Sequence, residues 1–150
     1  MTGASGASGI GVADLRRRVR ASVHSVSLLR RELTDWAARA GLSREIMEAV
    51  ALAGYEALAN AVEHAYPAHD DDAVDLHARL ADRLVTVTVT DWGRWREPPA
   101  DPGHRGRGLI LIDKLCTRAE ITATDTGTTV VMTWKLDEIP GPGSGPRSAP

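Results

Sequence analysis

Apolar and polar residues alternate along this chain at two different periods, and these periods predict its helices and strands. A period near 3.6 predicts a helix from about Ser25, taken as its N-cap, to about Arg39. The same period predicts a second helix that follows a capping Ser43 and runs to about Ala65, where Pro67 stops it. The two helices come one after the other, so they are expected to share one layer.

The period of two is clearest where three valines alternate with three threonines, which is typical of a half-buried strand. Strands are predicted at residues 15–23, 73–80, 84–90, 119–124 and 128–136, and a third helix is predicted at 108–115. A turn at Asp82 and Arg83 joins two of the strands, and a long loop at 92–107 precedes the third helix. Grouped helices and hairpins predict an α+β fold, a two-layer sandwich of a mixed, mainly antiparallel sheet with helices on one face.

Composition limits the class of protein. The 150 residues are 43% hydrophobic and 25% charged, which is typical of a single globular domain. Residues 1–11 and 138–150 are rich in small residues, glycine or proline and are predicted to be disordered tails around a domain at 12–137. The net charge of −2 with scattered basic residues argues against direct nucleic-acid binding, and no apolar stretch predicts a membrane span. The single cysteine, Cys116, excludes an internal disulfide, is expected to be a buried, unreactive thiol and fits a cytoplasmic location.

The second predicted helix carries Glu56, Asn60 and His64 at a spacing of four residues, so the three lie on one ridge. This ridge borders the apolar face of the helix, and half-buried polar groups there need partners. One interpretation is a polar network that is satisfied within the protein, or simply an exposed edge of the helix. The other is a carboxylate general base beside an amide oxygen that helps to hold Mg²⁺. The helix alone does not choose between them.

Three other segments suggest a ligand site. Asp91 ends the strongest strand and can accept a hydrogen bond from a ligand amino group, while Gly93 lets a flat ring approach the backbone, although Asp-x-Gly is also a common turn. Gly106 and Gly108 precede the third helix and expose N–H groups to an anion, with Arg105 and Arg107 nearby. Many helices begin after glycine, however.

The last strand begins with Gly127 and Thr128. The Thr128 hydroxyl can add a hydrogen bond to a ligand site, but threonine is also favoured in strands for packing reasons. Trp36 on the first helix has two interpretations as well. It is either an ordinary core residue or an anchor for self-association.

In this order, the segments resemble the ATPases shared by histidine kinases, DNA gyrase and certain heat-shock chaperones, with a Bergerat-type ATP-binding fold. The resemblance rests on the Asn-bearing helix, the Asp-x-Gly loop, the Gly-x-Gly loop and the late Gly-Thr strand, and it covers nearly all of the domain. The run from Glu56 through Asn60 to His64 and the Arg-Gly-Arg-Gly-Leu stretch ending at Leu109 resemble bacterial anti-sigma-factor serine/threonine kinases.

The resemblance implies ATP and Mg²⁺ as cofactors and assigns roles to single residues. Glu56 would be the general base and Asn60 the Mg²⁺ ligand, while Asp91 would bind the adenine amino group. The remaining implied nucleotide contacts are Gly93, Arg105, Gly106, Arg107, Gly108, Leu109 and Thr128. Phosphoryl transfer depends mainly on positioning and charge neutralisation, so this small set is chemically sufficient.

The implied partners are an anti-anti-sigma protein of the STAS type as phosphoacceptor, a sigma factor, and a second copy in a homodimer. Trp95 stands where family members often have a further glycine, and the Pro-rich loop around it also contains Trp92. This departure motivates an alternative, a module that binds ATP and acts by nucleotide-dependent protein binding without transferring phosphate. A detached histidine-kinase domain ranks third, because the chain offers no suitable phosphoacceptor histidine.

Overall fold

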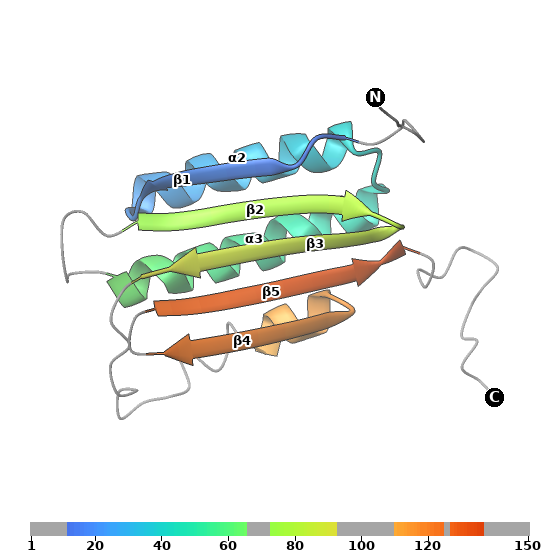
Figure 1. Ribbon diagram of the computed structural model, residues 1–150. Coiled ribbons are helices and arrows are strands. Elements are labelled where there is room, and N and C mark those ends of the chain that lie inside the picture. Colours follow the sequence, from blue (N-terminus) through green and yellow to red (C-terminus); the bar gives the residue numbers. More distant parts are fainter. Residues whose placement is uncertain (1–11, 66–72, 93–109, 125–126, 137–150) are drawn as a thin grey trace.

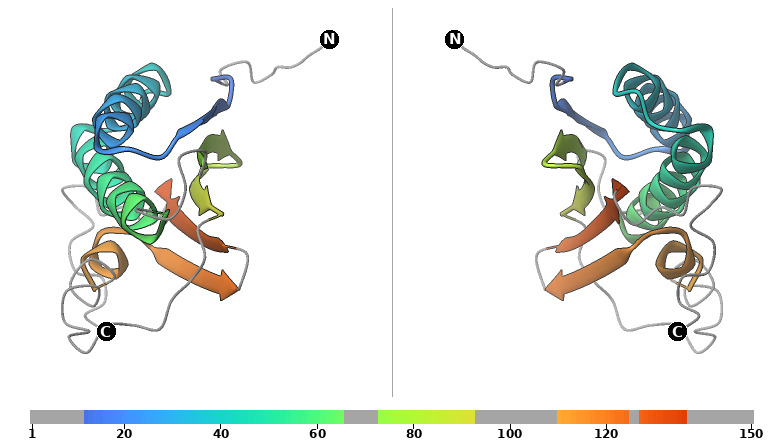
Figure 2. Two further views of the ribbon diagram at one scale, coloured as in Figure 1. Left: turned by 90° about the vertical axis from the view of Figure 1, so that its left-hand side faces the viewer. Right: turned by 90° about the vertical axis from the view of Figure 1, so that its right-hand side faces the viewer.

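The computed structural model describes residues 12–65, 73–92, 110–124 and 127–136. They form one five-stranded sheet with two long helices on one of its faces (Figures 1 and 2). The elements are β1 (Leu15–Arg20), α2 (Val23–Arg39), α3 (Arg44–Ala65), β2 (Ala73–Ala81), β3 (Leu84–Asp91), β4 (Arg118–Thr124) and β5 (Gly127–Lys135). A short helical segment at 110–115 lies on the same side as α2 and α3 (Figure 2). The predicted two-layer α+β sandwich is confirmed.

The strands lie in the order β1-β2-β3-β5-β4. Every strand pair within the described ranges is antiparallel, so the expectation of a mixed sheet is wrong for this part of the chain. The reason is the position of β5. Strands β3 and β4 run in the same direction in Figure 1, but β5 lies between them and pairs antiparallel with both. The sequence predicted the hairpins correctly, but it did not predict that β5 lies between β3 and β4.

The N-cap of helix α2 lies three residues before the predicted cap. Ser22 is the N-cap, and its side chain accepts a hydrogen bond from the backbone N–H of Ser25 at 3.0 Å. Ser25 lies in the first turn, where its hydroxyl donates to the carbonyl of Arg20 at 2.5 Å. The prediction of Ser25 as the cap is therefore wrong, because β1 ends at Arg20 and the chain turns into the helix at once. The hydrogen bond from Ser25 instead links the start of α2 to the end of β1.

The connection from α2 to α3 follows the sequence closely. Gly41 adopts a left-handed conformation with φ of 79°, which a residue without a side chain adopts at little cost. The N–H groups of Gly41 and Leu42 donate to carbonyls in the last turn of α2. Ser43 then caps α3 by accepting from the N–H of Ile46 at 3.2 Å, as predicted.

Within the part of the chain described here, no helix has the length and apolarity that crossing a membrane requires.

The core lies between the helices and the sheet. Val85, Val87 and Val89 of β3 are buried and face α3, while the threonines between them point to the opposite face. Trp36 is completely buried and its indole N–H donates to the carbonyl of Ala13 at 2.9 Å, which confirms the core interpretation. Burial of such a large apolar surface is the main source of stability in a domain of this size.

Cys116 is half-buried, not fully buried as predicted, because it follows the short helical segment near the edge of the core. Its thiol donates to the carbonyl of Ile112 at 3.0 Å. Desolvation by burial, and then the negative charge of Asp113, raise the pKa of the Cys116 thiol. Since the thiolate is the reactive form, the raised pKa agrees with an unreactive cysteine.

Candidate functional site

Asp91 and Thr128, which are far apart in the sequence, lie side by side at one end of the sheet. Asp91 is the last residue of β3 and Thr128 is the second residue of β5, and the strand register pairs them directly. Directly paired Cα atoms in an antiparallel sheet are about 4.5–5.5 Å apart. The C-terminal end of α3 reaches the same end of the sheet (Figures 1 and 2). The structure therefore brings together two of the residues predicted to bind the base.

The alternation of β3 determines where the Asp91 side chain points. Val85, Val87 and Val89 face the helices, and Asp91 continues this row at the strand end. Its exposed fraction is only 2%. A carboxylate in such a position is costly to bury unless it is held by polar partners, and a ligand amino group is one such partner. This placement fits the predicted role of an acceptor inside a pocket.

Thr128 shows the clearest sign of an incomplete site. The residue is 4% exposed, and its Oγ1 atom is buried without a hydrogen-bond partner among the residues that the structure describes. A buried hydroxyl without a partner costs about 1–3 kcal/mol. Thr128 faces the same side of the sheet as Asp91, its cross-strand neighbour. An unsatisfied hydroxyl beside a buried carboxylate is the pattern expected where a polar ligand completes the hydrogen bonds.

Gly127 also shapes this site, although no role was assigned to it from the sequence. A Cβ at this position would clash with the carbonyl oxygen of Asp91 and crowd the Cα of Trp92. Only glycine lets β5 begin so close to the end of β3, and this approach sets Thr128 opposite Asp91. A glycine within a strand pattern was the available sign, because such a glycine often marks a close backbone approach.

The ridge of α3 supplies the other described candidates. Glu56 and Asn60 are half-buried, one turn apart on a helix that packs against β2, β3 and β5. Within the described ranges, neither side chain forms a hydrogen bond or an ion pair. The alternative of a satisfied polar network therefore has no support in this part of the chain. Both side chains retain their hydrogen-bonding capacity for a ligand.

The described residues contain no cluster of three or more His, Cys, Asp or Glu that could form a protein-only metal cage. Mg²⁺ does not need one, since it is commonly held by one or two protein oxygens, water and substrate phosphates. The unpartnered amide of Asn60 suits that mode. The described residues thus fit a nucleotide-bound Mg²⁺.

Six of the predicted contacts lie outside the described residues: Gly93, Arg105, Gly106, Arg107, Gly108 and Leu109. Trp95 lies there too, and the side chain of His64 is not described. The helix expected after the glycines is present at 110–115. The predicted phosphate-binding loop remains a prediction.

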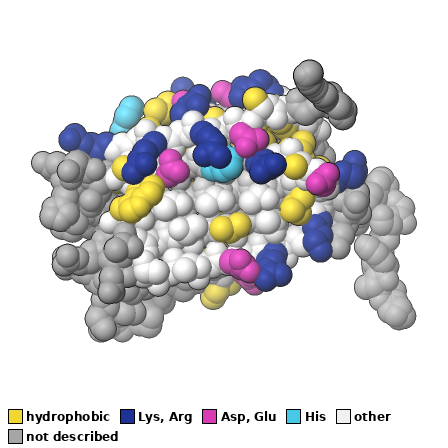
Figure 3. Space-filling view, viewed as in Figure 1, with side chains coloured by type: hydrophobic (Ala, Val, Ile, Leu, Met, Phe, Trp, Pro, Cys, Tyr) yellow, Lys and Arg dark blue, Asp and Glu magenta, His cyan; other side chains and the backbone are white. Residues whose placement is uncertain are grey.

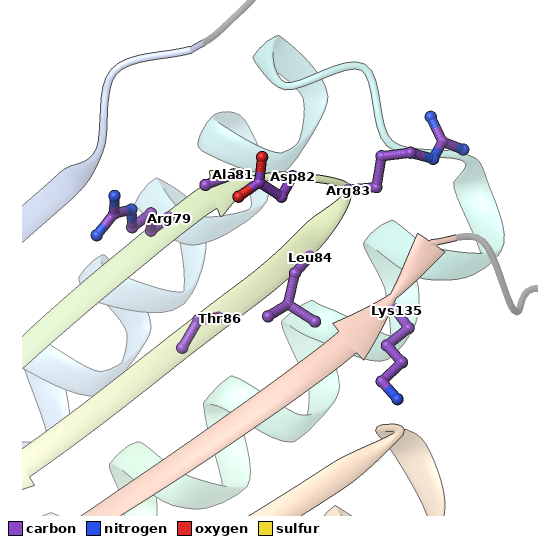
Figure 4. Close-up of a pocket in the computed structure, with 7 residues that line it drawn as sticks. All are labelled: Arg79, Ala81, Asp82, Arg83, Leu84, Thr86 and Lys135. Atoms are coloured by element: carbon purple, nitrogen blue, oxygen red, sulfur yellow. The ribbon is translucent and has the colours of Figure 1, made fainter.

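A shallow pocket of about 570 Å³ lies at the other end of the sheet, around the turn between β2 and β3 (Figure 4). Its lining includes Arg79, Leu84, Thr86 and Lys135. Leu84 and Thr86 point away from the helices, opposite to the row that ends in Asp91. This pocket is therefore separate from the candidate nucleotide site. The unpartnered hydroxyl of Thr128 identifies the nucleotide site better than the size of a cavity does.

Replacing Thr128 by Val is expected to stabilise the protein and weaken ATP binding. The variant keeps the shape and removes the unpartnered hydroxyl, so the free energy of unfolding should rise by about 1 kcal/mol. Loss of one hydrogen bond to the nucleotide should raise the Kd for ATP about five-fold. Denaturant unfolding and isothermal titration measure the two effects.

Thr129→Val is the matched control, since Thr129 is the next residue of β5 and points to the opposite face. It should leave ATP affinity unchanged. A Thr128→Val variant that is destabilised, with ATP affinity unaltered, would show that the hydroxyl has a partner inside the protein.

Residues 19–134 match the family described as histidine kinase-like ATPase domain. The serine-protein kinase RsbW of Listeria monocytogenes serotype 4a is 33% identical over 128 residues, 75% of this chain and 81% of that protein. The Staphylococcus epidermidis protein of the same name is 28% identical over 134 residues, 79% of this chain and 84% of the relative.

A solved structure is also similar. It is the crystal structure of the RsbU and RsbW domains of a Mycobacterium tuberculosis protein, with a TM-score of 0.68 and 26% sequence identity. The match covers 83% of this chain but only 33% of that longer chain.

Proposed function

This chain belongs to the histidine kinase-like ATPase family, and from that membership we propose that it is an ATP-dependent serine/threonine protein kinase of the anti-sigma-factor type. Its relatives named serine-protein kinase RsbW favour a kinase over a module that only holds ATP. The observation that supports the nucleotide site most directly is the unpartnered, buried hydroxyl of Thr128 beside the buried carboxylate of Asp91.

In this proposal the end of the sheet holds the adenine. Asp91 accepts a hydrogen bond from the adenine amino group, and Thr128 supplies its hydroxyl to the same ligand. Gly93 lies beside the base and leaves room for the ring. Burial of Asp91 and Thr128 supports this assignment, since hydrogen bonds in a water-poor site discriminate strongly between ligands.

The ridge of α3 and the loop after β3 then serve the phosphates. Asn60 would hold the Mg²⁺ that accompanies ATP, which would supply charge neutralisation at the phosphates. The remaining phosphate contacts in the proposal are Arg105, Gly106, Arg107, Gly108 and Leu109. The oxygen of the incoming serine or threonine bonds to the γ-phosphorus, the bond to the β-phosphate oxygen breaks, and ADP leaves. Glu56 takes the proton of the attacking hydroxyl.

The proposed phosphoacceptor is a small anti-anti-sigma protein of the STAS type. The proposed second partner is a sigma factor that the kinase sequesters, so that the chain regulates transcription in the bacterial cytoplasm. We also propose that the chain works as a homodimer. The names of the relatives and of the neighbouring RsbW domain support this class of partner.

The direct test is transfer of labelled phosphate. The purified chain, γ-labelled ATP and Mg²⁺ are mixed with a STAS-type protein from the same cells, and the label should appear on a serine or threonine of that protein. Omission of Mg²⁺ should abolish labelling. Tight ATP binding without transfer to any STAS-type protein of those cells would instead identify a nucleotide-dependent binding module.

A further inference from the structure

The face of the sheet opposite the helices carries a net positive charge. By strand register it contains six basic residues, Arg16, Arg18, Arg20, Arg79, Arg118 and Lys135, against two acidic residues, Asp75 and Glu120. The whole chain, in contrast, has a net charge of −2. Asp14 also reaches this face, where its carboxylate lies 2.9 Å from His77, yet the excess remains positive. Figure 3 shows this face, on which Lys and Arg side chains outnumber the Asp and Glu side chains that lie between them.

Four of these arginines form a continuous group, which we call the arginine row: Arg16, Arg18 and Arg20 on β1, and Arg79 on β2. All four are exposed, and none forms an ion pair with a described residue. Arg17 is different, because it points to the helix side and pairs with Glu32 of α2 at 2.5 Å. Alternate residues of a strand are about 6.6 Å apart, so the row presents a regular series of cations.

The backbone of β1 shows how a partner would approach the row. β1 is an edge strand, and an edge strand can in general accept another strand. Here the Arg16 carbonyl already accepts from the Arg17 guanidinium at 2.8 Å, and the Arg20 carbonyl accepts from Ser25 at 2.5 Å. Both carbonyls are thus already engaged by side chains of the protein. A partner is therefore expected to lie across the face and not to extend the sheet.

The same face offers an apolar contact beside the charges. The pocket in Figure 4 is lined by Leu84 and Thr86, with Arg79 and Lys135 on either side of it. Asp82 and Arg83 of the turn also line it, so its charged lining is three cations and one carboxylate. Arg79 thus belongs to both the pocket and the arginine row. An apolar side chain seated over Leu84 would bring neighbouring carboxylates within reach of these cations. The surface fits a segment that combines acidic residues with an apolar one.

The other end of the row approaches the candidate nucleotide site. The Arg18 guanidinium lies over the indole of Trp92, 4.3 Å from the ring centroid. Trp92 directly follows Asp91 in the sequence. A segment bound along the row would therefore lie next to the strand end that carries the proposed base site, on the opposite face of the sheet.

Charge and chemistry distinguish among possible occupants. A nucleic acid is disfavoured, because Trp92 is the one described aromatic residue next to the row and Arg18 lies over its ring, which reduces the surface on which bases could stack. A second copy binding through the same face would bring two positive surfaces together, which is repulsive. An acidic protein segment meets neither objection and complements the charge.

We propose that the arginine row docks an acidic segment of a protein partner, which places an apolar side chain in the pocket around Leu84. This surface goes beyond the proposed kinase activity and does not depend on it, since it lies on the face opposite Asp91 and Thr128. Binding to the row and phosphoryl transfer can therefore be measured separately.

The test uses the full chain and a labelled peptide, Glu-Glu-Glu-Leu-Glu-Glu-Glu, as the probe in fluorescence anisotropy. The variant Arg16→Gln/Arg18→Gln/Arg20→Gln should raise the Kd for the peptide about ten-fold, because three exposed ion pairs are lost. Added salt should weaken wild-type binding, as expected for exposed charges. Arg79→Gln alone should give a smaller loss, and this single change guards against misfolding of the triple variant.

The matched control is Arg31→Gln/Arg39→Gln/Arg44→Gln, which removes the same charge from exposed positions on the two helices. It should bind the peptide as the wild type does, and all variants should retain ATP affinity in titration calorimetry. Equal weakening by both triple variants, or no binding by the wild type at about 0.15 M salt, would overturn the proposal. Tighter binding of oligouridylate than of the peptide would also overturn it. So would a wild-type dimer that dissociates in the Arg16→Gln/Arg18→Gln/Arg20→Gln variant but not in the control variant.

Discussion

Replacing Glu56 by Gln is expected to slow phosphoryl transfer by about 10²–10⁴-fold while the Kd for ATP stays within about two-fold. The amide keeps the shape of the side chain but cannot take the proton of the attacking hydroxyl. Glu56 is half-buried and has no polar partner within the described ranges, so the change should break no internal contact. Single-turnover transfer at saturating ATP measures the chemical step, and calorimetry measures binding.

Glu63→Gln is the control for this experiment, because Glu63 lies on the same helix but is exposed. It should transfer phosphate at the wild-type rate. A normal rate in the Glu56 variant would show that another group is the base. A large loss of ATP affinity would show that Glu56 holds the nucleotide and does not act on the incoming hydroxyl.

The second large effect is expected from Asp91→Asn, which should raise the Kd for ATP by roughly 10–150-fold. A hydrogen bond to a charged group is worth about 1.5–3 kcal/mol, and the variant removes the charge at nearly constant volume. The effect should be specific for the base, so affinity for a nucleotide without an amino group at that position, such as inosine triphosphate, should change little. Calorimetric titration with both nucleotides gives the comparison.

Asp75→Asn provides the control for Asp91, since Asp75 lies on neighbouring β2 and points to the helix-free face. Its affinity for ATP should equal that of the wild type. Thermal unfolding checks that the Asp91 variant remains folded, because Asp91 takes part in interactions within the protein. If ATP and inosine triphosphate lose affinity equally, Asp91 supports the strand end and does not bind the adenine amino group.

Local patterns were sufficient to predict most of the fold. The alternating valines and threonines gave β3, and the 3.6-residue period with Ser43 gave α3, because these features depend on neighbours within a few residues. The start of α2 was wrong by three residues because Ser22 and Ser25 are both good caps. The bond from Ser25 to the Arg20 carbonyl depends on where β1 ends, and a local pattern does not contain that information.

The sequence by itself determined the helix ridge of Glu56 and Asn60, the strand that ends in Asp91 and the order of motifs that resembles the ATPase family. Only the tertiary structure decided that β5 lies between β3 and β4, which sets Thr128 opposite Asp91 and leaves its hydroxyl unpartnered. It also gathered the arginine row from two strands that are far apart in the chain. Both results follow from strand register, which is selected by burial of one whole face against the helices and not by any single residue.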